Sequence, residues 1–219
     1  MTEVLMEKKS NQVDYSLGEE IANSISHGIG AALSIAGLVV LIVSAVAHGD
    51  AWHVVSFSIF GSTLILLYLA STLYHSFPQL KVKRVLRKFD HAAIFLLIAG
   101  TYTPFMLVSL RGPWGWSLFG VIWGLAITGV VLKMYFVHRF PKLSTAIYVL
   151  MGWLCVIAAK QMLIQVPPIS ITFLVIGGLS YTIGVVFYAW KKLPYNHAIW
   201  HLFVLGGSVM HFFSVLNIV

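Results

Sequence analysis

Long apolar blocks separated by short polar segments make up most of the 219-residue chain. The first run, GIGAALSIAGLVVLIVSAVA, begins at Gly28 after a polar segment, residues 1–27. Six more blocks follow, at about residues 52–74, 89–110, 114–132, 143–159, 169–190 and 196–218. Each is long enough, at 1.5 Å per residue, to cross about 30 Å of hydrocarbon as a helix. The pattern predicts an all-α bundle of seven transmembrane helices in residues 28–219, behind a polar segment in residues 1–27.

The composition supports this reading, because 59% of the residues are hydrophobic and only 10% are charged. Soluble domains are closer to 25% charged and 45–50% apolar. Seven spans of about 20 residues leave only short connections, so no soluble domain fits between the helices. These figures exclude an ordinary soluble protein, a disordered chain and a nucleic-acid-binding protein. The first run is too long for the apolar part of a cleavable signal peptide, so we count it as a span.

The basic residues predict the orientation of the chain. The formal net charge is +7, and the 14 Lys and Arg residues lie in short segments between the apolar blocks. With seven spans, only Arg111 and Lys160 fall on the side opposite the N-terminus. Because basic loops stay inside, the N-terminus is predicted in the cytoplasm and the C-terminus outside. The twelve basic residues on the predicted inner side are Lys8, Lys9, Lys81, Lys83, Arg84, Arg87, Lys88, Lys133, Arg139, Lys142, Lys191 and Lys192.

Two local patterns predict features of helix packing. Gly120 and Gly124 have the small-xxx-small spacing that lets membrane helices approach closely, so we expect them at a helix–helix contact. Pro104, inside the third block, leaves the Gly100 carbonyl without its helical partner, so a kink is expected there.

A single carboxylate, Asp90, follows Asp50 in the chain, and it stands at the start of the third apolar block. An unpaired carboxylate deeper in a membrane helix costs roughly 2.5–3.5 kcal/mol, so Asp90 is expected to have a partner. One candidate partner is the basic run that precedes it, from Lys81 to Lys88. The other is a functional site at the same depth.

Three histidines favour the second possibility, a functional site that includes Asp90. His75 closes the second block, and His197 and His201 open the seventh, one helical turn apart on one face. The predicted orientation brings all three to the depth of Asp90. Three imidazoles suit Zn²⁺ and leave a fourth position for water, as in catalytic zinc sites. An H-x-x-x-H pair alone is weak, and packing or interfacial histidines are the alternative. The single cysteine, Cys155, excludes a thiolate cluster and an internal disulfide.

Further polar side chains extend the candidate site. Ser71 lies one turn before His75, on the same face, although membrane serines usually bond their own i−4 carbonyl. His27, Asn23 and Glu19 recur every four residues and would hydrogen-bond the metal-bound imidazoles from outside, or else form a solvated helix entry. His91 points about 100° away from Asp90, so it is a candidate only for such a supporting role.

The remaining histidines are not expected at the site. His211 lies about 21 Å along the helix from His197. His48, His53 and His138 are expected near the membrane surfaces.

Taken together, the motifs resemble the bacterial hemolysin III family, a branch of the progestin and adipoQ receptor superfamily. The resemblance runs from about Tyr15 to the end of the chain. It rests on Glu19-Glu-Ile-Ala-Asn-Ser-Ile-Ser-His27, Ser71-Thr-Leu-Tyr-His75, Phe89-Asp90-His91, Ile98-Ala-Gly-Thr-Tyr-Thr-Pro104 and Asn196-His-Ala-Ile-Trp-His201.

The resemblance implies a seven-helix membrane protein with a cytoplasm-side zinc ion held by His75, His197 and His201. It also places Ser71 and Asp90 in that site. The wider superfamily includes zinc-dependent ceramidases, while the bacterial branch is associated with membrane state and energetics, and in some members with lysis of red cells. His91 departs from the receptor branch, so receptor function carries over poorly.

The leading hypothesis is a bacterial inner-membrane protein whose zinc site senses or modifies membrane lipid. If the site is catalytic, Asp90 accepts a proton from the activated water and Ser71 helps to stabilise the oxyanion during hydrolysis of a lipid amide or ester. The second hypothesis is a non-enzymatic membrane-homeostasis factor with structural zinc, and the third is a cytolysin or channel. Membrane lipid is the expected partner, and the sequence indicates no soluble protein partner.

Overall fold

The structure is a computed structural model that describes residues 15–137 and 139–219, and within these ranges all regular elements are helical. Seven helical segments are long and apolar enough to cross a membrane. The predicted seven-span, all-α membrane fold is therefore confirmed. The proposed division into residues 1–27 and 28–219 stays a prediction, and Lys8, Lys9 and His138 lie outside the described residues.

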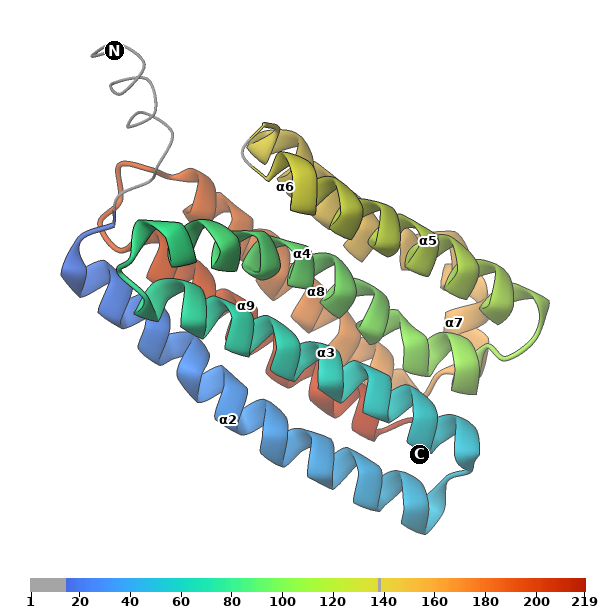
Figure 1. Ribbon diagram of the computed structural model, residues 1–219. Helices are drawn as coiled ribbons and strands as arrows, with labels where there is room; N and C mark the ends of the chain where they lie inside the picture. The colour runs from blue at the N-terminus through green and yellow to red at the C-terminus, as the bar shows by residue number, and fades with distance from the viewer. Residues whose placement is uncertain (1–14, 138) are drawn as a thin grey trace, which may run out of the picture.

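Five spans are formed by single α-helices and a sixth by a helix with a π-helical extension. The first two are α2 (Leu17–His48) and α3 (Ala51–Ser76), and the third is α4 (Leu80–Pro104), continued by the π-helical turn η1 (Phe105–Ser109). The others are α5 (Pro113–Phe136), α8 (Pro168–Ala189) and α9 (Asn196–Leu216). Consecutive helices α2 to α5 run side by side, and α9 packs against both α8 and α2 (Figure 1). The last helix is thereby brought beside the first.

The first helix begins at Leu17, well before the apolar run that starts at Gly28. Ser16 caps it: the Ser16 hydroxyl accepts a hydrogen bond from the Glu19 amide, and the Ser16 amide donates to the Glu19 carboxylate. This reciprocal capping box fixes a helix start. Hydropathy identifies only the apolar part of a membrane helix, so it did not predict the polar first turns of α2.

The span between residues 141 and 165 is broken, where the sequence predicts one continuous block. It consists of α6 (Pro141–Gly152), the 3₁₀ turn η2 (Leu154–Ala158) and α7 (Ala159–Gln165). The Tyr102 hydroxyl lies at the break, 2.9 Å from the Met151 and Gly152 carbonyl oxygens, and accepts a hydrogen bond from the Cys155 amide at 2.8 Å. Backbone groups freed in hydrocarbon need such partners, so the tyrosine stabilises the break.

The irregularity expected at Pro104 takes the form of the π-helical turn η1, which follows the proline. The prediction for Gly120 and Gly124 is wrong for packing within the chain. Both glycines are exposed, and a Cβ atom at either would meet no atom within 4 Å. The close approach on α5 is instead made by Gly115, where a Cβ would lie 2.2 Å from the Met106 carbonyl oxygen and 2.5 Å from that of Leu110.

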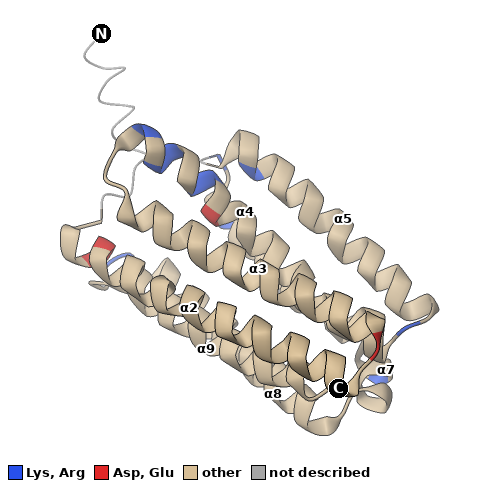
Figure 2. Cartoon of the chain, turned by 60° about the horizontal axis from the view of Figure 1, so that its bottom comes forward, with Lys and Arg blue, Asp and Glu red and all other residues tan. Residues whose placement is uncertain are grey.

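Charged side chains mark the two ends of the bundle. We call the end where α2, α4 and α9 begin and α3, α5 and α8 end the basic end. Figure 2 shows the Lys and Arg residues of α4 gathered along its first turns there, with Asp90 just beyond them. At the opposite end, Asp50 caps α3 and lies 3.6 Å from Arg111. The assignment of the basic end to the cytoplasm remains a prediction.

Replacing Gly115 by alanine should destabilise the fold, because its neighbours are backbone carbonyls that cannot rotate away. Overpacking of this kind typically costs about 1–3 kcal/mol. The matched control is Gly120→Ala on the same helix, which has open space around it and should keep or slightly raise stability. Thermal unfolding of the purified protein in detergent measures both. Equal Tm values for the two variants would contradict the close packing at Gly115.

Candidate metal centre

Three buried histidines meet at the basic end. His75 comes from the last turn of α3, and His197 and His201 come from the first two turns of α9. One ring nitrogen of each lies within 4.8 Å of the others, and the three residues are 2–9% exposed. Two nitrogens on one tetrahedral zinc, with bonds of about 2.0–2.1 Å, would be roughly 3.4 Å apart. The arrangement can hold a metal ion after small rotations of the rings.

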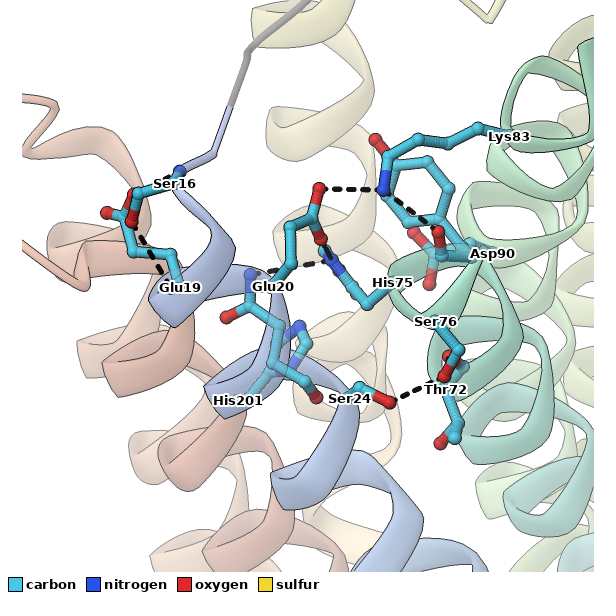
Figure 3. A network of polar contacts seen from close by, with 12 residues as sticks. Ser16, Glu19, Glu20, Ser24, Thr72, His75, Ser76, Lys83, Asp90 and His201 are labelled. Atoms are coloured by element: carbon cyan, nitrogen blue, oxygen red, sulfur yellow. Dashed lines mark hydrogen bonds and ion pairs between the residues drawn. The ribbon is translucent and has the colours of Figure 1, made fainter. Parts of the chain in front are cut away.

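A carboxylate orients the first of these rings. The Nδ1–H of His75 donates to Glu20 Oε2 at 2.6 Å, and Lys83 Nζ lies 2.6 Å from the other oxygen, Oε1, of the same carboxylate (Figure 3). The Nε2 atom of His75 is left buried without a hydrogen-bond partner. A histidine that gives one N–H to a carboxylate and keeps its other nitrogen free is the usual form of a metal ligand.

The backbone of α2 orients a second ring. His201 Nδ1 lies 3.1 Å from the Asn23 carbonyl oxygen, to which it donates, and 3.1 Å from the Ser26 hydroxyl. The Asn23 side chain is fully buried, with its amide nitrogen 3.4 Å from His75 Nδ1. His197 contributes a buried Nδ1 that has no hydrogen-bond partner. Unpartnered imidazole nitrogens are expensive in a dry interior, and a shared cation would satisfy them.

The three residues proposed on one face of α2 take different places. Asn23 and His27 both reach the histidines, and the His27 ring stacks on His201 with centroids 3.5 Å apart and planes 8° apart. Both ring nitrogens of His27 are buried without hydrogen-bond partners. Glu19 is not brought to the site. Its carboxylate accepts from the Ser16 and Tyr195 amides, so it joins the start of α2 to the start of α9.

Ser71 and Asp90 face one cavity together with two of the three clustered histidines. This cavity has a volume of about 220 Å³, and His197, His201 and His91 also contribute to its lining. The Ser71 hydroxyl is buried and has no hydrogen-bond partner, whereas its neighbours Thr72 and Ser76 bond their i−4 carbonyls. The Ser71 hydroxyl therefore stays available to a molecule in the cavity.

Asp90 does not pair with the basic run that precedes it. Its side chain is 13% exposed, and its Oδ2 atom lies 3.2 Å from Nδ1 of His91. Among residues 15–137 and 139–219, no Lys or Arg nitrogen lies within 4.0 Å of the Asp90 carboxylate. His91 thus contacts the carboxylate rather than the three clustered histidines.

Two residues at the centre were not predicted. Glu20 is three residues before Asn23 and seven before His27, so it shares their face; a search at four-residue spacing selected Glu19 instead. Tyr15 precedes the helix, where no periodicity reveals it. Its ring stacks on His197 with centroids 5.0 Å apart and lies 5.8 Å from His75. Burial raises the pKa of the Tyr15 hydroxyl well above its usual range, so this residue covers the centre as a neutral group.

His211 and His53 lie away from the three clustered histidines, as expected. His211 donates from Nε2 to the Leu174 carbonyl at 3.1 Å, deep in the bundle. His53 belongs to the cap of α3, where its hydrogen bond to Asp50 lowers the pKa of that carboxyl.

Similar proteins identify the family of this chain. A family model described as "Haemolysin-III related" matches residues 15–212. The chain belongs to the hemolysin III family. It is 52% identical over 211 residues to Hemolysin-3 of Bacillus cereus, covering 96% of both chains, and 52% identical over 202 residues to the Hemolysin-3 homolog of Bacillus subtilis (strain 168), covering 92% of this chain and 95% of the relative. It is 27% identical to the human monocyte to macrophage differentiation factor, over 90% of this chain and 83% of that protein.

The residues that the family model matches include the helices that carry the histidine cluster. The family model begins at Tyr15 and ends within α9, so it includes the helices that supply all three clustered histidines. This member of the hemolysin III family is a multi-pass membrane protein with three buried histidines that can hold a metal ion.

Removal of the Glu20 charge should weaken metal binding while leaving the three histidines in place. Glu20→Gln is expected to lower zinc affinity about 10–100-fold, because the His75 ring loses its orienting carboxylate. The matched control is Glu19→Gln, which replaces the adjacent carboxylate by a side chain that still serves a capping box. Competition with a zinc chelator of known affinity measures both. Equal affinities for the two variants would show that Glu20 does not support the centre.

Proposed function

We propose that the protein holds zinc at His75, His197 and His201 and uses this centre to modify a membrane lipid by hydrolysing an amide or ester bond. The observation that carries the proposal is that two of the clustered histidines, His197 and His201, share one cavity with a free hydroxyl, Ser71, and a carboxylate, Asp90. These are the groups that metal-assisted acyl hydrolysis needs, gathered in a mostly apolar space that suits an acyl chain.

The location follows from the same features. Both relatives at 52% identity come from Bacillus, and the basic residues of α4 gather at the end that carries the histidines. We therefore place the protein in the cytoplasmic (inner) membrane of a bacterium, with the centre on the cytoplasmic side and membrane lipid as its partner. A lipid reaches such a site from within the bilayer, without leaving hydrocarbon.

Each side chain has a separate role in this proposal. A bound zinc would supply a Lewis acid able to activate water near neutral pH. Asp90 accepts the proton that the attacking water loses, and the Ser71 hydroxyl donates a hydrogen bond to the carbonyl oxygen as its negative charge develops. Glu20 and the Asn23 carbonyl hold the rings of His75 and His201 in place. Tyr15 limits access of bulk water to the histidines.

A second candidate function is a non-enzymatic role in membrane homeostasis, in which the metal only ties helices together. The Glu20–His75–Lys83 contact favours it, because it already joins α2, α3 and α4 at the basic end. A cytolysin or channel ranks third, despite the printed names of the relatives. Lys, Arg, Asp and Glu of the described residues lie toward the two ends of the bundle (Figure 2), whereas a conducting path needs polar lining throughout.

Metal analysis tests the centre itself. The purified wild-type protein should contain about one zinc per chain, since the part of the chain that the structure describes holds a single cluster of three histidines. The His197→Ala/His201→Ala variant should contain almost none, because one imidazole cannot hold the ion. The control is His211→Ala, which removes a buried histidine outside the cluster. Equal zinc in all three proteins would refute the assignment of the ligands.

Lipid turnover separates the enzyme from the structural role. The wild-type protein, incubated with a panel of membrane lipids, should release fatty acid that mass spectrometry detects. Asp90→Asn should slow this release about 10²–10⁴-fold, because the proton acceptor is lost. Asp50→Asn, a carboxylate change at the opposite end, should retain activity. Zinc content is measured in each variant. A zinc-loaded wild-type protein that turns over no lipid would favour the structural role.

A further inference from the structure

The cavity beside the histidines extends far into the bundle. Its lining runs along α4 and η1 from Asp90 to Met106, a distance of about 24 Å at 1.5 Å per residue. It also includes Met162 and His211, which lie in the later halves of the spans Pro141–Gln165 and Asn196–Leu216. Its volume of about 220 Å³ is much larger than the roughly 30 Å³ of one water molecule. A space this long and mostly apolar is shaped for a chain of methylene groups rather than for a compact solute.

Two cations face the same cavity at its basic end. Arg87 lies one turn before Asp90 on α4, and Lys133 belongs to the last turn of α5. Lys133 is only 4% exposed, and the Nε atom of Arg87 is buried without a hydrogen-bond partner. The hydroxyl-bearing residues Ser144 and Thr145 of α6 line the cavity as well. Their hydroxyls donate to the Phe140 and Pro141 carbonyls, so the two cations are the groups at this end that can receive an anion.

Neither cation has a counter-charge among the described residues. No ion pair within residues 15–137 and 139–219 includes Arg87 or Lys133. Two acids lie nearby in the fold, but the Glu20 carboxylate is shared by His75 and Lys83, and Asp90 contacts His91. Lys133 is buried and Arg87 is half-buried, and cations held beside a space of low polarity are costly unless an anion joins them. The fold thus leaves two positive charges for a group that enters from outside.

We propose that Arg87 and Lys133 form a binding site for the anionic group of a single-chain lipid whose tail occupies the cavity. The site takes a carboxylate or a phosphate, either of which matches the hydrogen-bonding edge of a guanidinium. Such a group would come from a fatty acid or from a phospholipid. The proposal takes the cavity as the lipid site of the function proposed above, and it adds that charge on the lipid decides which molecules are held there.

Binding to metal-stripped protein tests this proposal apart from any turnover. Purified full-length protein is treated with a chelator, and the affinities of oleate, lysophosphatidylglycerol, neutral oleyl alcohol and inorganic phosphate are measured by native mass spectrometry or calorimetry. The wild type should bind the two anionic lipids at least tenfold more tightly than oleyl alcohol or phosphate alone. Removal of one charge-assisted contact typically weakens binding about tenfold, so Arg87→Gln and Lys133→Gln should each lose about that factor for anionic lipids.

Matched variants distinguish a charge effect from damage to the fold. Arg84→Gln removes an exposed cation on the same helix and should bind like the wild type. Arg87→Lys keeps the charge and should recover part of the affinity, while oleyl alcohol should bind all variants within about twofold. Loss for oleate alone would assign the site to carboxylates, and loss for lysophosphatidylglycerol alone would assign it to phosphates.

Three results would overturn the proposal. One is unchanged affinity of the Arg87→Gln/Lys133→Gln double variant for both anionic lipids. Another is an equal loss for oleyl alcohol, which would indicate altered packing rather than lost charge. The third is a wild-type protein that binds no anionic lipid, or that binds inorganic phosphate as tightly as it binds the anionic lipids. None of these results depends on zinc content or on hydrolysis. The experiment can therefore refute the anion site without refuting the proposed hydrolysis, and an absence of hydrolysis would not refute the anion site.

Discussion

The contact of one carboxylate, Glu20, with His75 and Lys83 is the interaction on which the basic end of the bundle depends. Polar groups at this depth must be satisfied by the protein, because hydrocarbon offers them no hydrogen bonds. Glu20 meets this requirement for one imidazole and one ammonium group at once, and so joins three helices. It also fixes the His75 ring with its free nitrogen toward the other histidines. Without that orientation, α3 and α9 would bring imidazoles together but not their lone pairs.

The arrangement of the outer polar contacts explains why the centre can exist near a membrane surface. Asn23 and Ser26 supply oxygen atoms to the inward edge of His201, while Tyr15 lies over His197. The nitrogens left without partners, such as His75 Nε2 and His197 Nδ1, are consequently available to a metal ion. Ser71 differs from neighbouring hydroxyl residues in the same way, since its hydroxyl is not used by its own helix. Groups left unsatisfied in this manner concentrate around one cavity, which is typical of sites that receive a ligand.

Much of the fold could be predicted from hydropathy, because seven apolar blocks must cross the bilayer as helices. The three clustered histidines could also be predicted, since helix periodicity pairs His197 with His201 and basic loops place His75 at the same end. Hydropathy could not predict the polar start of α2, because that start depends on the Ser16 cap. It also could not predict the break after Gly152, because the break depends on Tyr102 from another helix. Gly120 and Gly124 show the limit of a motif: the spacing is present, yet no atom of the described residues lies against either glycine. The role of Glu20 was not predicted, because residues three apart as well as four apart share a helix face and only the four-residue spacing was considered.

The position of Tyr15 has a practical consequence for handling the protein. Since this ring rests on His197, a histidine-rich affinity tag added at the N-terminus would be tethered to the same end of the bundle as the three clustered histidines and could compete with them for a metal ion. The last helix ends at Leu216, at the far end of the bundle from these rings. A tag fused behind Val219 would keep foreign imidazoles a full membrane thickness away.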